Sequence, residues 1–581
     1  MSTSSRFEDV PIEVLIDNIF PLLPVQDLLY LTCCNKFFSI VCSDDTLWRR
    51  KLVEDFNFTG ESTARTSGWK FIYSRLSNPK VFVWGDKGNA RLGLPVLPKS
   101  VLGGGIPYPV PLKIPARIVK LAAGGMYANI SLLIRGSDPP PSGRSTRLIQ
   151  QGTFMSGVSS FIDLLDKGPK ADALTQGTLD GSIGYNPSNV GFSSPFKQAS
   201  QPMKLVMPSP IRSISCGRLH SSCLDKTNKI WTFTRWGRPF WLSSPILAEP
   251  EYRPIQIECG WVFSSFLTKS GDVFVWWPSA TTMRSMIQAK MQEMDQQVNS
   301  TIWPDGNTIP CAPWALDMMP FKLPSIPALP PLQQSNSEGE ERNVHLIQIA
   351  GFDCHIVGLT NEGHVLKYGQ LHDEVRASEG RWEYLPEFSE LDKVKSNPIF
   401  VPGAHALEPQ PPATLKITHV TADFAHFIAY STGSHSTVLI GDRETTPSSV
   451  PKLIPELQNK SVISVAIGDY HSAALTADGK LFTWGKYCTG ALGLGDPLEL
   501  EPGTPGAFVD ERVRTDARQR GRTYSTPPDV TSPTEVRFDH FSKKKPLDRF
   551  CFAVTAAGWH TGALVIDLEV SSTMSDINSN L

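Results

Sequence analysis

The feature that most constrains the fold of this chain is a repeated sequence unit, whose clearest copy lies at residues 462–495. The copy contains an apolar run that ends at Gly468, a second run that begins at His471, an Asp-Gly turn, and a third run that ends in Trp484-Gly485. Short apolar runs separated by glycine turns indicate antiparallel strands. Because a repeated unit specifies a repeated structure, the number and spacing of its copies predict the architecture of the chain.

The first half of the unit occurs seven times, as an apolar run that is followed in six copies by a glycine and in five copies by a histidine. The runs begin at Ile118, Ile211, Ile255, Leu346, Ile417, Val462 and Phe552. Five copies carry the histidine, at His220, His355, His426, His471 and His560. Each histidine belongs to a different copy, so we expect each to serve the hydrogen bonding of its own repeat rather than a shared metal or catalytic site.

The second half of the unit also occurs seven times, but one copy is divided between the two ends of the chain. Phe552–Leu564 has no Trp-Gly run after it, whereas Val81–Gly85 has no first half before it. Such a division closes a ring, because the last strands pair with the first and leave no open sheet edge. The repeats resemble those of the regulator-of-chromosome-condensation family, which implies a mainly β chain with a seven-bladed β-propeller over residues 80–568.

Long insertions separate the repeats, and most of them are expected to be surface loops. They are rich in Pro, Ser, Gln and charge, and they cover residues 136–146, 153–204, 279–343, 370–413 and 496–532. Within one of them, Met283–Val298 has a helical period, which predicts an inserted helix whose methionines pack on the propeller. We expect a disordered tail at 569–581.

The N-terminal segment has a different pattern, because its apolar residues recur at intervals of three and four, as in an amphipathic helix. Asp9 is predicted to cap this helix, and further short helices are expected after Asp27, Asn35 and either Ser43 or Asp44. Such short helices bury too little surface to be stable alone. Their apolar faces therefore either pack on the rest of the chain or dock the helices of a partner.

The order of residues in this segment is similar to that of an F-box. The resemblance rests on Val10–Leu15, Ile19–Pro24, Asp27–Leu31, Asn35–Phe38 and Leu47-Trp48, with Val10 in place of the leucine that starts the family pattern. It implies a small all-α F-box at 7–52, a helical linker at 53–79, and binding to the Skp adaptor and through it to a cullin. By motif position, the adaptor contacts are Pro11, Ile12, Leu15, Ile19, Leu22, Pro24, Leu28, Leu31 and Phe37.

Charge and cysteine content limit the partners and the compartment. The 55 Lys and Arg nearly balance the 57 Asp and Glu, which argues against nucleic acid as a partner. Polar residues interrupt the longest apolar stretches and the first residues lack a secretory pattern, so we expect no membrane association. Ten cysteines without a CxxC pair indicate reduced thiols of a cytoplasmic or nuclear protein.

No motif predicts catalysis, a metal or a cofactor. There is no HExxH, no zinc-type Cys-His spacing and no nucleophile elbow, and the glycine-rich run at 490–495 lacks the Gly-Lys-Ser/Thr ending of a phosphate loop. One basic cluster comprises Arg512, Arg514, Arg518, Arg520 and Arg522. It is either a solvated loop or a patch that receives an acidic or phosphorylated substrate, since arginine pairs bidentately with phosphate.

An F-box joined to a propeller implies a non-catalytic substrate receptor of a cullin ubiquitin ligase, in which the F-box holds the adaptor and the propeller presents a protein target. The combination resembles the fungal SCF-associated factor family, which suggests a metabolic enzyme as the target. Two alternatives remain open: nucleotide exchange on a small GTPase, and a scaffold that binds the adaptor without delivering a target.

Overall fold

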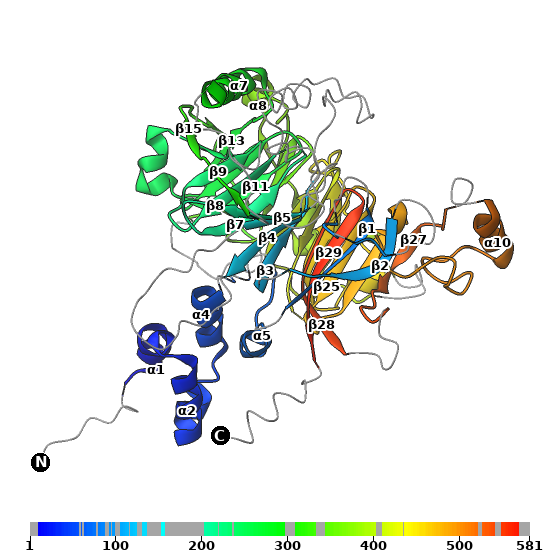
Figure 1. Cartoon of the computed structure of the whole chain (residues 1–581). Helices are drawn as coiled ribbons and strands as arrows, with labels where there is room; N and C mark the ends of the chain where they lie inside the picture. Colours follow the sequence, from blue (N-terminus) through cyan, green and yellow to red (C-terminus); the bar gives the residue numbers. More distant parts are fainter. Residues whose placement is uncertain are drawn as a thin grey trace, which may run out of the picture.

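The protein is mainly β, with a group of short helices at its N-terminal end (Figure 1). The computed structural model describes residues 10–568 except 57, 59, 61–62, 77–78, 88–91, 95, 99–104, 115–116, 125–129, 136–152, 157–202, 219, 235–237, 297–307, 333–342, 402–408, 434, 521–525 and 541–547. The predicted tail at 569–581, the predicted cap Asp9 and much of the first repeat therefore lie outside the described residues.

Within the described residues the strands form seven separate sheets, numbered here I to VII. Sheet I contains β2 (Gly105–Leu112), β1 (Lys80–Asp86), β29 (His560–Asp567) and β28 (Arg549–Ala557). Sheet II contains β14 (Thr308–Pro310), β6 (Met203–Val206), β5 (Thr153–Ser156), β4 (Ile130–Arg135) and β3 (Arg117–Ala122). Sheet III contains β15 (Trp314–Leu316), β10 (Phe240–Leu242), β9 (Ile230–Phe233), β8 (Ser221–Asp225) and β7 (Ile211–Cys216).

The remaining four sheets follow in chain order. Sheet IV contains β11 (Pro254–Cys259), β12 (Ser264–Thr268), β13 (Val273–Trp276) and β16 (Phe321–Lys322). Sheet V contains β17 (Leu346–Phe352), β18 (His355–Thr360), β19 (Val365–Tyr368) and β20 (Trp382–Tyr384). Sheet VI contains β21 (His419–Asp423), β22 (His426–Tyr430) and β23 (Val438–Asp442). Sheet VII contains β24 (Val462–Ile467), β25 (His471–Thr476), β26 (Leu481–Gly485) and β27 (Val530–Glu535).

The sheets follow one another around a closed ring. One strand of each sheet contacts the corresponding strand of the next, in the order β3, β7, β11, β17, β21, β24, β28 and back to β3. These inner strands line a central cavity of about 510 Å³. The two ends of the chain meet in sheet I, where β1 pairs antiparallel with β29 and Gly85 lies opposite His560. The predicted closure of the ring by its first and last strands is confirmed.

The repeated histidine packs under the glycine that precedes it. A side chain at Gly217 or Gly468 would meet the ring of His220 or His471, with Cβ–Cε1 distances of 2.5 and 2.3 Å. Nε2 of His220 donates to the Phe263 carbonyl at 3.1 Å, and Nε2 of His471 lies 2.7 Å from the Thr561 hydroxyl. Both bonds reach the next sheet around the ring. The expectation that the histidines bond within their own repeat is therefore wrong for these two.

Several insertions contain regular structure where loops were expected. The predicted helix is present as α7 (Thr281–Gln296), and Met283 and Met291 are buried against the ring. The insertion at 370–413 supplies β20, which completes sheet V, together with α9 (Leu391–Lys395). The same insertion also holds α8 (Glu374–Glu379), η11 (Pro386–Phe388) and η12 (Pro398–Phe400). Other insertions and connections hold α10 (Glu511–Arg520), η9 (Pro245–Ala248), η10 (Pro250–Tyr252), η13 (Pro455–Leu457) and η14 (Cys488–Gly490).

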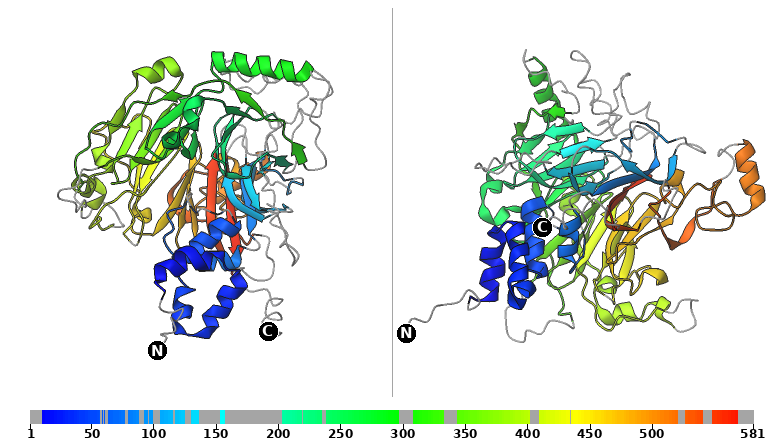
Figure 2. Two further views of the ribbon diagram at one scale, coloured as in Figure 1. Left: turned by 90° about the vertical axis from the view of Figure 1, so that its left-hand side faces the viewer. Right: turned by 60° about the horizontal axis from the view of Figure 1, so that its bottom comes forward.

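The N-terminal helices, called here the helical module (residues 10–76), project from one side of the ring (Figures 1 and 2). They are α1 (Ile12–Val14), η2 (Leu15–Ile19), η3 (Phe20–Leu22), α2 (Val25–Cys34), α3 (Lys36–Val41), α4 (Asp45–Phe56) and α5 (Trp69–Arg75). The Asn35 side chain caps α3, and Asp44 rather than Ser43 accepts from the first turn of α4. Helix α4 runs past residue 52, where the sequence places the end of the F-box.

Candidate functional site

The helical module has a small core of its own at the end farthest from the ring. The buried members of this core are Leu15, Ile16, Phe20, Leu28, Phe38, Val41, Cys42 and Leu47. Apolar side chains on consecutive short helices converge here because no single one of these helices could bury its face alone. The apolar residues of the module that do not belong to this core are therefore the ones that its outer surface exposes.

The nine residues that the F-box resemblance assigns to adaptor contact separate into three groups. Leu15 and Leu28 have no exposed surface and belong to the core of the module. The half-buried residues are Ile19, Leu31 and Phe37. The exposed residues are Pro11, Ile12, Leu22 and Pro24. Leu22 is the extreme case, with 81% of its surface exposed. The structure thus leaves seven of the nine positions accessible to a partner.

Other large apolar side chains of the module are exposed although the sequence analysis did not select them. Leu29, Tyr30 and Ile40 have 49%, 57% and 73% of their surface exposed. The signal was present in the run Leu28–Leu31, because one face of a helix cannot bury four consecutive apolar residues. Leu28 faces the core, and its two successors therefore face outward. Together with Leu22, these side chains give the module a surface that is richer in apolar groups than a solvated helix requires.

A buried lysine holds the segment that carries Leu22. The Lys51 ammonium donates to the backbone carbonyls of Pro21 and Leu23, at 3.2 and 3.3 Å, and lies 3.3 Å from the Asp55 carboxylate. These carbonyls flank Leu22 on both sides, so helix α4 fixes the backbone at the most exposed apolar residue of the module. The Lys51 side chain is itself buried, which strengthens its hydrogen bonds.

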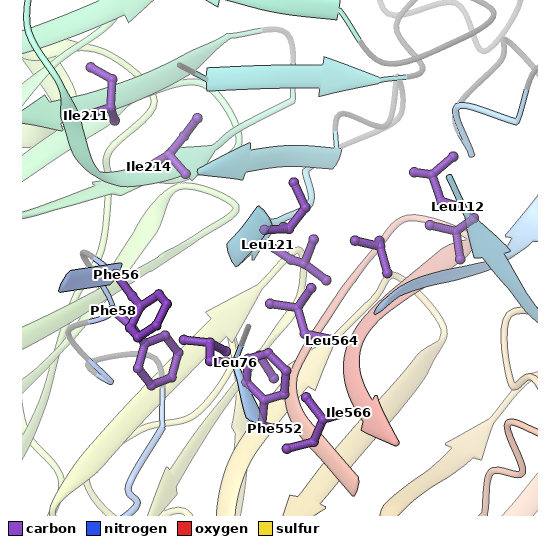
Figure 3. Close-up of a cluster of buried hydrophobic side chains, with 14 of the residues drawn as sticks. Phe56, Phe58, Leu76, Leu112, Leu121, Ile211, Ile214, Phe552, Leu564 and Ile566 are labelled. Atoms are coloured by element: carbon purple, nitrogen blue, oxygen red, sulfur yellow. The ribbon is translucent and has the colours of Figure 1, made fainter. Parts of the chain in front are cut away.

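The helical module is joined to the ring by a continuous apolar cluster. Phe58 meets Phe552 of β28 edge to face, with ring centroids 6.0 Å apart, and Phe71 meets Phe550 in the same manner at 5.1 Å. Figure 3 shows Phe56 and Phe58 beside Leu76 and Phe552 in this cluster. The Arg65 guanidinium also donates to the Ala477 carbonyl of the ring. The module therefore has a fixed orientation relative to the sheets.

The opposite end of the inner strands carries aromatic side chains. The module contacts the ring at the start of β24, where the Ala64 amide donates a hydrogen bond to the Ile463 carbonyl. The glycine turns lie at the opposite ends of the inner strands and so form the rim that faces away from the module. On that side the Trp261 ring contacts Phe424, with centroids 5.1 Å apart, and the Arg218 guanidinium, which lies 5.0 Å from its centroid. Tyr470, 38% exposed, lies on a further turn of this rim.

The central cavity runs between these two ends. Arg49, Gly60 and Thr63 of the module help to line it. Its walls include Glu258, which receives hydrogen bonds from Gln256 and Ser215 and whose pKa burial raises to about 7. Within the described residues, no group of three or more His, Cys, Asp or Glu is placed to hold a metal ion.

The predicted arginine patch does not lie in a loop. Arg512, Arg514 and Arg518 lie on helix α10. At the start of this helix the Asp510 carboxylate accepts a hydrogen bond from the Val513 amide, and farther along Ala517 is buried against Leu498 and Phe508. The Arg514 guanidinium donates to the Leu500 carbonyl at 3.0 Å and Arg518 lies 3.4 Å from the Leu498 carbonyl, so both help to hold the insertion. Arg512 is exposed, and Arg522 and the Arg520 side chain lie outside the described residues.

No helix in the described part of the chain is both long and apolar enough to cross a membrane.

The family model of the Regulator of chromosome condensation (RCC1) repeat matches residues 462–486. SCF-associated factor 1 of Saccharomyces cerevisiae is 31% identical over 153 residues, which are 26% of this chain and 20% of that protein. F-box protein pof9 of Schizosaccharomyces pombe is 30% identical over 164 residues, 28% of this chain and 30% of that protein.

These matches confirm the resemblance to F-box proteins with regulator-of-chromosome-condensation repeats. They span less than a third of the length of either relative. Among solved structures, Prp20p of Saccharomyces cerevisiae is similar at 14% identity and a TM-score of 0.46, over 87% of this chain and 95% of that chain. Human WBSCR16 is similar at 16% identity and a TM-score of 0.45, over 85% of this chain and 100% of that chain.

Proposed function

We propose that this chain is the substrate-recognition subunit of an SCF (Skp–cullin–F-box) ubiquitin ligase. In this proposal the F-box covers residues 7–52, with 53–79 as its helical linker, and the seven sheets are the blades of a seven-bladed β-propeller over 80–568. The observation that carries the proposal is an apolar surface on a small helical module that packs against a large ring of sheets through a shared apolar cluster. The names of the two fungal relatives support it.

The exposed apolar residues of the module are proposed to bind the Skp adaptor, which in turn binds a cullin. Leu22, Leu29, Tyr30 and Ile40 would lose water-exposed surface on docking, and burial of apolar surface is the main driving force for such contacts. Pro11, Ile12, Ile19, Pro24, Leu31 and Phe37 are proposed to contribute as well. Leu15 and Leu28 act from within, because they shape the core on which these residues stand.

The ring is proposed to hold the target protein on the rim that faces away from the module. Trp261, Phe424 and Arg218 pack together there, and tryptophan and arginine are the side chains that most often dominate binding energy at protein interfaces. A second contact is proposed at α10, where Arg512 is exposed and would pair with an acidic or phosphorylated residue. A metabolic enzyme is the class of target that the fungal resemblance favours.

The mechanism is a gain in effective concentration rather than chemistry by this chain. Because the module is fixed to the ring, a target on the rim is held at a constant place relative to the adaptor and cullin. Constraining two reactants in this way converts a bimolecular encounter into an intramolecular one. The ubiquitin transfer itself is assigned to the enzymes that the cullin recruits, and the chain is proposed to work in the cytoplasm, the nucleus or both.

The deciding experiment is co-purification of the Skp adaptor with the full chain. The variant Leu22→Asp/Ile40→Asp places charges on two exposed side chains, so it should fold normally and lose the adaptor. Val375→Asp is the matched control, because Val375 is as exposed as Ile40, at 73%, but lies on α8 in the ring. Leu15→Asp is unsuitable as the test, because it buries a charge in the core of the module.

Full recovery of the adaptor with the double variant would overturn the adaptor site. Acceleration of GDP release from a small GTPase by the chain alone would instead favour nucleotide exchange. If the adaptor binds but no cellular protein gains half-life when residues 10–56 are deleted, the chain is a scaffold that delivers nothing.

A further inference from the structure

Residues 323–332, with the sequence Leu-Pro-Ser-Ile-Pro-Ala-Leu-Pro-Pro-Leu, connect β16 to the segment before sheet V and are called here the proline strap. The strap is fully described and is neither helix nor strand. Its burial nevertheless repeats every three residues. Leu323 is buried in the core between sheets IV and V, and Ile326 and Leu329 are partly buried against that core. Leu332 is buried as well.

A period of three identifies the conformation of the strap. A strand would alternate every two residues and an α-helix every 3.6, whereas a polyproline II helix has three residues per turn. The leucines and the isoleucine therefore form one ridge that faces the protein. Pro324, Pro327 and Pro330 form a second ridge, and all three are exposed. The third ridge, also exposed, consists of Ser325, Ala328 and Pro331.

Two side chains of sheet V fasten the strap at both ends. The Trp382 indole N–H donates to the Pro324 carbonyl at 2.9 Å, and Nε2 of His364 donates to the Pro330 carbonyl at 2.8 Å. The opposite ring nitrogen of His364 lies 3.0 Å from the Thr360 hydroxyl, which fixes the plane of the imidazole. With its carbonyls held and its apolar ridge buried, the strap has little conformational freedom left to lose.

We propose that the proline strap is a docking site for a partner protein that carries an SH3-type groove. Such grooves are lined by aromatic side chains and recognise prolines at PxxP spacing on a polyproline II helix. The strap presents this spacing twice, at 324, 327 and 330, on ridges that point outward. Because the helix is already formed and anchored, docking avoids the ordering entropy that a free proline-rich peptide loses.

An exposed basic residue adjoins, in sequence, the tryptophan that anchors one end of the strap, and we expect it to favour one orientation of the partner. Arg381 directly precedes Trp382, which anchors the Pro324 end, and 84% of the Arg381 side chain is exposed. Its contact with Glu383 is long, at 3.8 Å, and a pair so exposed is weak. An acidic residue beside the partner's groove would therefore be attracted to the Pro324 end. The strap itself carries no charge, so it would not repel such a residue.

The test uses the full chain and a panel of purified SH3 domains, with affinity measured by interferometry. At least one domain should bind the wild type, and Pro324→Ala/Pro327→Ala/Pro330→Ala should weaken that binding by about tenfold or more. Pro250→Ala/Pro411→Ala is the matched control, because these prolines are exposed outside the strap and should leave the affinity unchanged. Melting temperatures establish that each variant is folded.

A second variant guards against loss of binding through unfolding. Ala328→Glu changes only an exposed ridge and leaves the prolines and the buried ridge in place, so it should also block the groove. Arg381→Glu should weaken binding at low salt and have less effect at high salt. The proposal is overturned if no domain of the panel binds the wild type, or if the triple proline variant and Ala328→Glu bind as tightly. Recovery of the Skp adaptor should be unaffected by all of these changes, so the two proposals fail independently.

Discussion

The rings of Phe58 and Phe552 meet edge to face with their centroids 6.0 Å apart, although the two residues stand at opposite ends of the chain. Phe58 follows the last long helix of the module, and Phe552 lies on β28 in the sheet that closes the ring. One aromatic contact therefore joins the two parts of the molecule at the place where the ring itself is joined. The proposed function, in which a target is held at a set distance from the adaptor, requires such a connection.

This contact predicts energetic coupling between the two rings. Phe58→Ala and Phe552→Ala should each lower the free energy of unfolding by about 3–5 kcal/mol. The double variant should lose less than the sum, by about 0.5–1.5 kcal/mol, since the second truncation removes a ring that has already lost its partner. Urea denaturation measures all three values. Phe58→Ala with Phe274→Ala is the control pair, because Phe274 lies in sheet IV and its effect should simply add.

The bracing of the module by Lys51 leads to a second prediction. Lys51→Met keeps most of the buried stem but leaves the Pro21 and Leu23 carbonyls without their donor, which should destabilise the module by about 1–3 kcal/mol. The backbone around Leu22 should then exchange its amide hydrogens faster, and the affinity for the adaptor should fall. Lys36→Met, at an exposed position of α3, should change neither. Unchanged exchange around Leu22 would refute the bracing role.

The repeats were predictable from the sequence because their turns require particular residues. Glycine recurs at positions where the histidine ring leaves no room for a Cβ atom. The Trp-Gly pair lies near the end of β1, the strand that pairs with β29 where the ring closes. The pairing of β1 with β29 followed from the single divided repeat. The bonds of His220 and His471 to neighbouring sheets could not be foreseen, since the pattern of one repeat contains no information about which atoms of the next repeat approach it.

The candidate site was predicted less completely than the fold. Motif position selected Leu22 and Ile12, which are exposed, and it also selected Leu15 and Leu28, which are buried. A linear motif records which positions are apolar, and both a core and an interface need apolar residues. Only the packing of α2 and α3 on η2 separates the two roles. The helix at α10 was missed because its charge outweighs the short apolar contact of Ala517.

The closure of the ring predicts an unequal response to alanine at two glycines. Gly85 has a φ of +105° and its Cβ would lie 2.4 Å from the Trp559 carbonyl oxygen, which is backbone that cannot easily move. Gly433 has a similar φ of +90° but nothing within 4 Å of its Cβ position. Both variants carry the strain of a left-handed backbone, about 1 kcal/mol. Only Gly85→Ala adds a steric clash at the closure, so its melting temperature should fall much further than that of Gly433→Ala.

The buried histidines predict a loss of stability in acid. Burial lowers the pKa of His220 and His471 from 6.5 to about 4. Between pH 6.5 and 4 the unfolded chain binds histidine protons that the folded chain does not, so the contribution of each of these histidines to the free energy of unfolding falls as the pH decreases through this window and is constant above it. For one histidine the full loss is about 3 kcal/mol.

His220→Phe tests this linkage, because Phe263 fills the equivalent position under Gly260 in the next repeat. At pH 8 the free energy of unfolding of the variant should be about 1 kcal/mol lower than that of the wild type, because the hydrogen bond to the Phe263 carbonyl is missing. On acidification the free energy of unfolding should fall less in the variant than in the wild type. Glu258, whose pKa is raised to about 7, acts with the opposite sign, because the folded chain binds its proton first. Glu258 is present in both proteins, so its contribution cancels when the free energy of unfolding of the variant is subtracted from that of the wild type. Urea denaturation at pH 8 and pH 5 measures this difference. Equal acid sensitivity of the two proteins would show that His220 is protonated in the folded state.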